Sequence, residues 1–288
     1  MKLNKTEYDP KLNSYEVVIA GGAMIGTAIA WFLISNRDFN GKILVVEKDP
    51  TLEFSSTSRT NNSIRQQFSN RLNIEISKFS SNYILNFKSY MENDERIPEI
   101  MFNKIGYLYL ADDIKKLNLL KQNQKLQNSL NIPTKIYDQN SLLEKFPYLN
   151  VKNLIGGSYN NYNEGYFDSN TIFSWWKKKA AEKGVEFIKN EVTEIALGSK
   201  KINAITLKDG SKLKIGSFVN ATGTKASTFD KTHFLRIPVE PRKRYTFIFK
   251  TEAKINNSVP LIIDPTGIHF RSDGNYFLCG CAPEFDDT

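Results

Sequence analysis

The chain has 288 residues, of which 40% are hydrophobic and 24% charged, and its formal net charge is +8. This length and composition predict a folded globule of one large or two modest domains and exclude a disordered chain. No apolar run approaches the roughly 20 residues that cross a bilayer, and residues 1–10 lack the apolar centre of a secretory signal. We therefore expect a cytoplasmic protein without a membrane span.

The excess of basic residues does not form a recognisable binding stripe. The lysines are scattered, mostly on polar faces of expected helices such as residues 115–125, and no basic run is interleaved with aromatic residues. This distribution disfavours nucleic acid as a partner. Cys279 and Cys281, with His233 and His269, offer too few ligands at the wrong spacing for zinc, so no metal site is expected.

The first elements of the chain predict a mononucleotide-binding unit. Residues 16–20 form a short apolar run that ends at glycines and indicates a buried strand. Residues 24–34 predict a helix with small residues, and residues 42–47 predict a second buried strand. A strand, glycine loop, helix and strand within about thirty residues are typical of half a Rossmann-like fold.

The later segments predict helices and strands in alternation, followed by strands alone. Helices are expected at residues 71–91, 113–131, 141–146 and 170–183, after a polar loop at 53–70. Strands are expected at 106–111, within 156–167, and at 185–188, 192–197, 202–207, 212–215 and 218–221. From residue 238 onward only strands are expected, at 245–250, 260–264, 268–271 and 276–280.

The loop after the first strand is close to the dinucleotide motif G-x-G-x-x-G. Residues 17–26 read VVIAGGAMIG, in which Gly21 and Gly26 match the outer glycines and Ala23 replaces the middle one. The outer glycines allow a tight turn and a helix close to the sheet, and the helix N-terminus offers N–H groups to a pyrophosphate. Ala23 adds a methyl group but removes no N–H. Glycine turns of this kind also occur in α/β folds that bind no nucleotide.

An acidic residue ends the second predicted strand. Glu47 lies 21 residues after Gly26, where a carboxylate accepts hydrogen bonds from an adenosine ribose. The same negative charge disfavours a 2′-phosphate and therefore NADP. A solvated charge at the end of a strand is the alternative interpretation.

The polar segment that follows resembles a known family. Residues 55–69 read SSTSRTNNSIRQQFS, and with the glycine loop and Glu47 they resemble the D-amino-acid-oxidase-like superfamily of FAD-dependent oxidoreductases. That family includes sarcosine, dimethylglycine and glycine oxidases and dehydrogenases. Further segments match in order: NEGYFD at 163–168, EVTEI at 191–195, VNATG at 219–223, PRKRY at 241–245 and DPTGIHFR at 264–271. The resemblance extends from about residue 15 to the end.

The resemblance implies an α/β (α+β overall) architecture with FAD as cofactor. A Rossmann-like FAD-binding domain is expected at 15–90 and 151–230, and an interleaved antiparallel-sheet substrate or cap domain at 91–150 and 231–288. The backbone at Val192 is expected to meet the adenine. The residues expected to bind FAD are Gly21, Gly22, Ala23, Met24, Ile25, Gly26, Glu47, Lys48, Ser56, Thr57, Ser58, Arg59, Ser63, Ile64, Arg65, Val192, Ala221, Thr222 and Gly223.

The activity implied is oxidation of the C–N bond of a small amine or N-methyl amino acid by hydride transfer to the flavin. The catalytic candidates are Arg65, as a charge near the isoalloxazine, and Tyr107, on a strand that also carries Tyr109. An internal ion pair for Arg65 and core packing for the tyrosines are the alternatives. Three further arginines are expected at the surface, although one could meet a substrate carboxylate: Arg242, Arg244 and Arg271.

The family usually continues well beyond the last residue of this chain. A final glycine-containing loop at the flavin and a lysine associated with oxygen activation are expected there, so the cap domain is expected to be incomplete. Besides its amine substrate, the expected partners are an electron acceptor protein or the missing C-terminal segment. Two other functions stay open: a non-catalytic flavin-binding assembly or scaffold protein or fragment, and a tRNA-modifying FAD oxidase, which the charge of +8 would suit.

Overall fold

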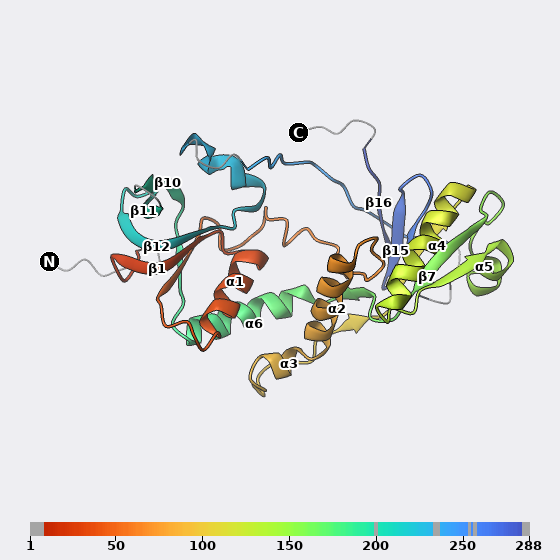
Figure 1. Cartoon of the computed structure of the whole chain (residues 1–288), viewed down its shortest axis with the longest axis horizontal. Coiled ribbons are helices and arrows are strands. Elements are labelled where there is room, and N and C mark those ends of the chain that lie inside the picture. The colour runs from red at the N-terminus through yellow and green to blue at the C-terminus, as the bar shows by residue number, and fades with distance from the viewer. Residues whose placement is uncertain (1–8, 199–200, 233–236, 253–254, 256–257, 284–288) are drawn as a thin grey trace. The chain divides into compact units, whose positions relative to one another are not determined.

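The computed structural model describes residues 9–198, 201–232, 237–252, 255 and 258–283 (Figure 1). The chain divides into two compact units, each made of two separate stretches. The first unit comprises Met1–Thr60 and Ser169–Pro241, and the second comprises Asn61–Asp168 and Arg242–Thr288.

The first unit is built on a six-stranded sheet with the order β10-β11-β12-β1-β2-β9. Its strands are β1 (Ser14–Ala20), β2 (Ile43–Glu47), β9 (Glu186–Lys189), β10 (Val192–Leu197), β11 (Ile202–Leu207) and β12 (Lys212–Asn220). Strands β12, β1, β2 and β9 run parallel, and β10 and β11 complete the sheet in antiparallel pairing. The predicted Rossmann-like architecture is confirmed.

Two helices and a 3-10 segment accompany this sheet: α1 (Met24–Ile34), α6 (Ser169–Glu182) and η1 (Gly223–Thr232). Helix α1 packs on β1, β2 and α6. Residues 17–20 of β1 and residues 43–46 of β2 are buried on both faces, as is typical of parallel strands covered on each side. Val18, Leu44 and Val46 pack with Ile205 and Phe229 in one core cluster, and Ile19 lies beneath Gly26 of α1.

Strand β12 was predicted as two strands, at 212–215 and 218–221, and this prediction was wrong. A Cβ atom on Gly216 would lie 2.7 Å from the carbonyl oxygen of Glu16 in β1. The glycine therefore marks the close approach of two neighbouring backbones rather than a turn.

The second unit contains a seven-stranded sheet with the order β13-β16-β15-β14-β5-β7-β6. Its strands are β5 (Tyr107–Ala111), β6 (Lys135–Asp138), β7 (Gly156–Asn160), β13 (Phe247–Phe249), β14 (Leu261–Ile263), β15 (His269–Asp273) and β16 (Tyr276–Gly280). A small sheet with the order β3-β8-β4 consists of β3 (Ser63–Ile64), β4 (Phe102–Asn103) and β8 (Gly165–Phe167).

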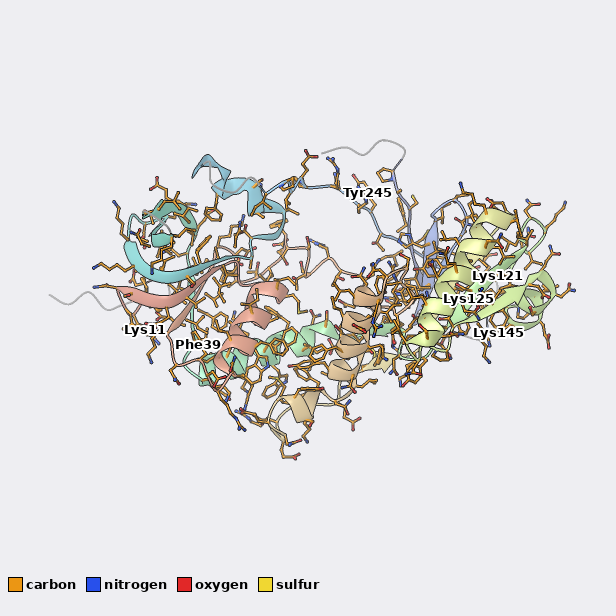
Figure 2. The ribbon with its side chains drawn as sticks, viewed as in Figure 1. Lys11, Phe39, Lys121, Lys125, Lys145 and Tyr245 are labelled. Carbon is orange, nitrogen blue, oxygen red and sulfur yellow. The ribbon has the colours of Figure 1, made fainter. Side chains whose placement is uncertain are left out.

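The helices of the second unit are α2 (Arg71–Leu85), α3 (Phe87–Tyr90), α4 (Ile114–Ser129) and α5 (Gln139–Lys145). Asn70, Asp113 and Asp138 cap α2, α4 and α5 by accepting a backbone N–H three residues later. The single helix predicted at 71–91 is divided at Asn86, whose side chain donates to the carbonyl oxygen of Asn82 and competes with the helix. Lys121 and Lys125 of α4 (Figure 2) are exposed, as is Lys115, and Lys116 is partly exposed.

The two faces of β5 have different surroundings. Leu108 and Leu110 pack in an apolar cluster with Leu142, Phe146 and Ile262. Tyr107 and Tyr109 point to the opposite face, since side chains alternate along a strand. There the cross-strand neighbours of Tyr107 and Tyr109 on β7 are Asn160 and Ser158. This second face is therefore aromatic and polar.

The boundaries of the two units differ from the predicted domain boundaries. Residues 61–90 and 151–168, expected in the FAD-binding domain, belong to the second unit. The reason is strand pairing, because β3 joins β8 and β7 joins β5 and β6. In the part of the chain that the structure describes, no helix has both the length and the apolar character to cross a membrane.

Candidate functional site

The ends of the parallel strands bring several predicted residues together in the first unit. The N–H of Gly21 donates to the carbonyl oxygen of Val46 at 2.9 Å, and the N–H of Ala221 donates to that of Ala20 at 2.8 Å. The glycine loop after β1, Glu47 at the end of β2 and the turn after β12 therefore meet at one edge of the sheet. In open parallel sheets, ligands bind at this carboxyl edge.

The two outer glycines of the loop are required by the backbone. Gly21 has φ +101°, and a Cβ atom there would lie 2.4 Å from the carbonyl oxygen of Ala221. A Cβ atom on Gly26 would lie 1.8 Å from the carbonyl oxygen of Gly21. Neither position has space for a side chain, so the loop and the start of α1 are in direct contact.

The N-terminus of α1 is open to an anion. Its N-cap residue, Ala23, has no side chain that caps the helix, and the N–H of Met24 donates to Thr57 Oγ1 at 3.2 Å. The N–H groups of Ala23, Ile25 and Gly26 have no hydrogen-bond partner among the described residues. Free N–H groups at the positive end of a helix dipole are suited to a phosphate.

Glu47 lies directly beside this loop. Its Oε2 accepts the N–H of Gly22 at 2.7 Å, and its Oε1 accepts the N–H of Asp49 at 2.8 Å. Each carboxylate oxygen keeps a further lone pair that can accept a ribose hydroxyl. The N–H of Asn190, two residues before Val192, donates to the carbonyl oxygen of Glu47 at 3.1 Å. Val192, at the start of β10, therefore lies two residues from the backbone contact between Asn190 and Glu47.

The remaining candidates of the first unit have different surroundings. Ser58 Oγ donates to the carbonyl oxygen of Leu52 at 2.7 Å, and Arg59 Nε donates to that of Glu53 at 3.2 Å, so both side chains bond to the preceding turn. Thr222 is held by Asn220 Oδ1, which accepts its hydroxyl at 2.7 Å. Lys48 and Ser56 have exposed side chains, and a Cβ atom on Gly223 would lie in open space. Thr57 is the member of the polar segment that contacts the glycine loop.

The other candidates lie in the second unit. Ser63 and Ile64 form β3 and pair with Tyr166 and Gly165 of β8. The guanidinium of Arg65 lies 4.7 Å from the centre of the Phe68 ring, and its buried Nε has no hydrogen-bond partner. Within the described residues no ion pair involves Arg65. This disfavours the alternative that Arg65 serves an internal ion pair.

Tyr107 and Tyr109 are neutral phenols on the polar face of β5. Burial raises the pKa of Tyr107, against the effects of a hydrogen bond with Ser63 and the positive charge of Arg65. Burial also raises the pKa of Tyr109, to about 12, again opposed by Arg65. Both phenols are therefore uncharged near neutral pH; Tyr107 is buried at 4% exposure, and Tyr109 is partly exposed.

The sequence interpretation missed the role of Glu164. Its side chain is fully buried at 0% exposure, and it accepts the backbone N–H groups of Gln66 and Gln67 on Oε1, the latter at 2.8 Å. Burial raises the pKa of the carboxyl group to about 7, although hydrogen bonds from Gln67 and Gln66 favour its charged form. A glutamate between Asn163 and Gly165 has the sequence pattern of an exposed turn. The neighbouring Gly165 is the one sequence signal that indicates close packing around Glu164.

We predict that stability depends on pH through Glu164. Its pKa is raised from 4.5 to about 7 on folding, so the contribution to stability is complete below pH 4.5 and is lost as the pH rises through 7. The free energy of unfolding should decrease by roughly 1.4 kcal/mol per pH unit within that range. Denaturant unfolding between pH 5 and 7 measures this slope, and the Glu164→Gln variant should lack this component. If the free energy of unfolding changed equally with pH in the Glu164→Gln variant and the wild-type protein, the assignment of this dependence to Glu164 would be wrong.

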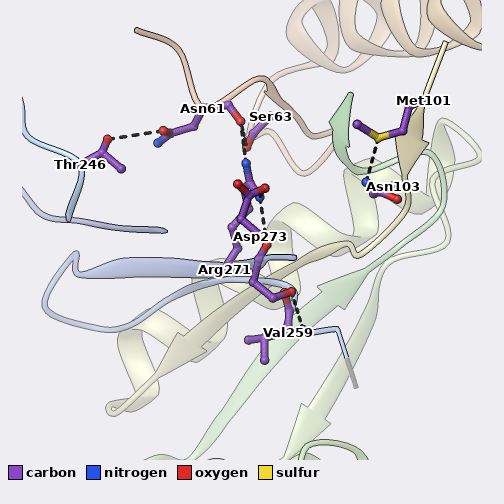
Figure 3. A network of polar contacts seen from close by, with 9 residues as sticks. Asn61, Ser63, Met101, Asn103, Thr246, Val259, Arg271 and Asp273 are labelled. Atoms are coloured by element: carbon purple, nitrogen blue, oxygen red, sulfur yellow. Dashed lines mark hydrogen bonds and ion pairs between the residues drawn. The ribbon is translucent and has the colours of Figure 1, made fainter. Parts of the chain in front are cut away.

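Arg271 was expected at the surface, and this expectation was wrong. Its exposure is 4%, and its guanidinium donates to Asp273 Oδ1 at 2.8 Å and to the carbonyl oxygen of Asn61 at 3.1 Å (Figure 3). It also lies 3.9 Å from the centre of the Tyr166 ring. The reason is that β15 is an interior strand, paired with β14 and β16. Arg242 and Arg244 are exposed, as predicted.

The residues of the first unit fit a dinucleotide. A glycine turn without space for side chains, an uncapped helix N-terminus and a carboxylate beside it match the needs of a pyrophosphate and an adenosine ribose. Across the residues that the structure describes, His, Cys, Asp and Glu form no group of three or more that could hold a metal ion.

Comparison with known proteins identifies relatives for nearly the whole chain. A family model described as FAD dependent oxidoreductase (DAO) matches residues 16–288. FAD-dependent oxidoreductase domain-containing protein 1 is 29% identical in Xenopus laevis, over 93% of this chain and 60% of that protein. The Bos taurus protein of the same name is 30% identical, over 93% and 62%. The chain therefore spans about three fifths of the length of these relatives.

Solved structures share the fold. The crystal structure of L-proline dehydrogenase from P. horikoshii has a TM-score of 0.76 and 23% identity, over 94% of this chain and 70% of that one. Glycine oxidase from Geobacillus kaustophilus has a TM-score of 0.76 and 19% identity, over 94% and 72%.

Proposed function

Because this chain belongs to the family of FAD-dependent oxidoreductases, we propose that it oxidises the C–N bond of a small amine or N-methyl amino acid. The observation that carries this proposal is the dinucleotide cradle of the first unit, with its glycine turn and open helix N-terminus. The names of the structural neighbours, a proline dehydrogenase and a glycine oxidase, support amino acids as the substrate class.

In this proposal the residues of the first unit hold the cofactor. The free N–H groups at the start of α1 bind the pyrophosphate, and Glu47 accepts the ribose hydroxyls while it orients the N–H of Gly22. Bound FAD supplies the acceptor for the two electrons and the hydrogen removed from the substrate carbon. The turn held by Asn220 presents Thr222 and Gly223 to the same ligand.

Residues of the second unit supply charge and orientation. Arg65 provides a positive charge that stabilises the negative charge developing during oxidation. Tyr107 and Tyr109, neutral at physiological pH, orient the substrate by hydrogen bonding. The amine has to be neutral to be oxidised, and neighbouring carboxylates would stabilise its protonated form. The aromatic and polar face of β5 therefore suits the reaction better than a face of carboxylates. We further propose an electron acceptor protein as the partner of this activity.

Absorption spectroscopy of the purified protein tests the proposal. We expect visible flavin bands, and we expect bleaching of these bands under anaerobic conditions by at least one of sarcosine, dimethylglycine, glycine or proline. A colourless protein that binds no added FAD would refute the cofactor and the activity together. Bound flavin that no amine bleaches would favour a scaffold protein, and salt-sensitive binding of tRNA would favour a tRNA-modifying oxidase.

A further inference from the structure

We propose that Glu164 is a positioning residue that clamps the backbone of Gln66 and Gln67 and thereby places Arg65 beside the polar face of β5. The clamp follows from contacts within the second unit. Its effect on catalysis rests on the proposed function, because that function assigns Arg65 its charge-stabilising role.

The carboxylate of Glu164 is the centre of a buried polar network. Its Oε1 accepts the N–H groups of Gln66 and Gln67, and its Oε2 accepts Gln67 Nε2 at 3.0 Å. The amide of Gln67 continues the network, because its Nε2 donates to the carbonyl oxygen of Tyr107 at 2.9 Å and its Oε1 accepts Ser158 Oγ at 2.9 Å. The carboxylate therefore holds residues 66 and 67, and the side-chain amide of Gln67 joins them to β5 and β7.

The segment is also held on the other side of Arg65. Ile64 pairs with Gly165 in the small sheet, and Arg271 donates to the carbonyl oxygen of Asn61 at 3.1 Å. Arg65 is the single residue between the pairing at Ile64 and the clamp at Gln66. Ser77 Oγ also donates to the carbonyl oxygen of Arg65 itself. The position of the guanidinium therefore depends on this bond together with the anchors on both sides.

The chemistry of the network requires a carboxylate. Glutamine at position 164 could still accept the two backbone N–H groups on its oxygen, but its NH2 group would face the NH2 group of Gln67. Turning the Gln67 amide over would break its bonds to Tyr107 and Ser158. The titratable groups with electrostatic effects on or from Glu164 are the phenols of Tyr107, Tyr109 and Tyr159. Within the described residues Glu164 forms no ion pair, so hydrogen bonds alone compensate its charge.

Amide hydrogen exchange of the FAD-loaded protein tests the clamp without using activity. At pH 8, above the pKa of about 7 of the Glu164 carboxyl group, we expect exchange at Gln66 and Gln67 to become roughly ten to a hundred times faster in Glu164→Gln, since hydrogen bonds to a charged group are strong. The matched control is Ser81→Ala, which removes a buried hydroxyl 3.4 Å from Gln66 Nε2 but no partner of the backbone N–H groups of Gln66 and Gln67, since this hydroxyl donates to the carbonyl oxygen of Lys78. Should Glu164→Gln fail to fold, Glu164→Asp is the second variant. Its shorter side chain keeps the negative charge but moves the carboxylate away from the N–H groups of Gln66 and Gln67, so the same acceleration of exchange is expected. Unchanged exchange at both amides would overturn the clamp.

The midpoint potential of bound FAD tests the connection to Arg65. We expect Glu164→Asp, which keeps the negative charge and only displaces the carboxylate, to make reduction about tenfold less favourable, a decrease of about 30 mV for a two-electron couple. Arg65→Ala should lower the potential as well, and the double variant should be no lower than Arg65→Ala alone. Additive effects would overturn the connection. If Arg65→Ala leaves the potential unchanged, the charge-stabilising role of Arg65 fails, and amide exchange alone decides the clamp.

Discussion

Gly26→Val is expected to abolish FAD binding, so the purified variant should be colourless. Even the Cβ atom of alanine would lie 1.8 Å from the carbonyl oxygen of Gly21 and 3.2 Å from Ile19 Cγ2. The obstacle is backbone, which cannot move aside as a flexible side chain can, so α1 has to shift away from the sheet. The N–H groups that would bind the pyrophosphate move with it. The ratio of flavin to protein absorbance measures this result.

A matched control separates loss of the cofactor site from general destabilisation. Gly41 lies just before β2, at the opposite end of that strand from Glu47, and a Cβ atom there would lie 2.7 Å from both Glu16 Cβ and the ring of Phe39 (Figure 2). Gly41→Ala should lower the unfolding midpoint, because over-packing costs about 1–3 kcal/mol, yet it should keep its flavin. Full flavin in Gly26→Val would show that the loop does not bind the cofactor.

Arg65→Ala is expected to slow anaerobic reduction of the flavin by roughly 10² to 10³-fold, the usual effect of removing a group that stabilises developing charge. Its guanidinium lies over Phe68 with a buried Nε that has no partner, so its hydrogen-bonding capacity is not used within the described chain. Stopped-flow absorbance at saturating amine measures the rate directly.

Two further variants show whether the effect belongs to charge and position. Arg65→Lys keeps the charge but lacks the planar fork of the guanidinium, so its rate should lie between those of Arg65→Ala and the unchanged protein. Arg71→Ala removes an exposed arginine paired with Glu75 at 2.8 Å and should change the rate less than twofold. If the rate for Arg65→Ala were within twofold of the wild-type rate, Arg65 would not stabilise charge in the reaction, and its role would be limited to packing against Phe68.

Local features of the chain were predictable because their causes are local. The limits of α1 and of β11 agree with the predictions at 24–34 and 202–207, since apolar periodicity and flanking turn residues determine them. The glycine loop was recognisable because a tight turn without space for side chains restricts both of its outer positions to glycine. The place of Glu47 followed from its position at the end of a strand next to that loop.

The network around Glu164 was not predictable, because its partners are distant in sequence. Glu164 and Gln66 are 98 residues apart, and Arg271 reaches Asn61 across 210 residues. Neither charged residue lies in a pattern that distinguishes a buried group from a solvated one. The same holds for the unit boundary, which depends on the pairing of β3 with β8.

The sequence by itself therefore determined the family resemblance, the dinucleotide loop and the α/β order of elements, since each depends on residue types within a short window. Only the tertiary structure decided which polar groups are buried and what they hold. Burial and hydrogen-bond partners are set by strands and turns that meet from remote parts of the chain. For that reason the expectation for Arg271 was wrong and the role of Glu164 was missed, although both residues lie in segments that carried the resemblance.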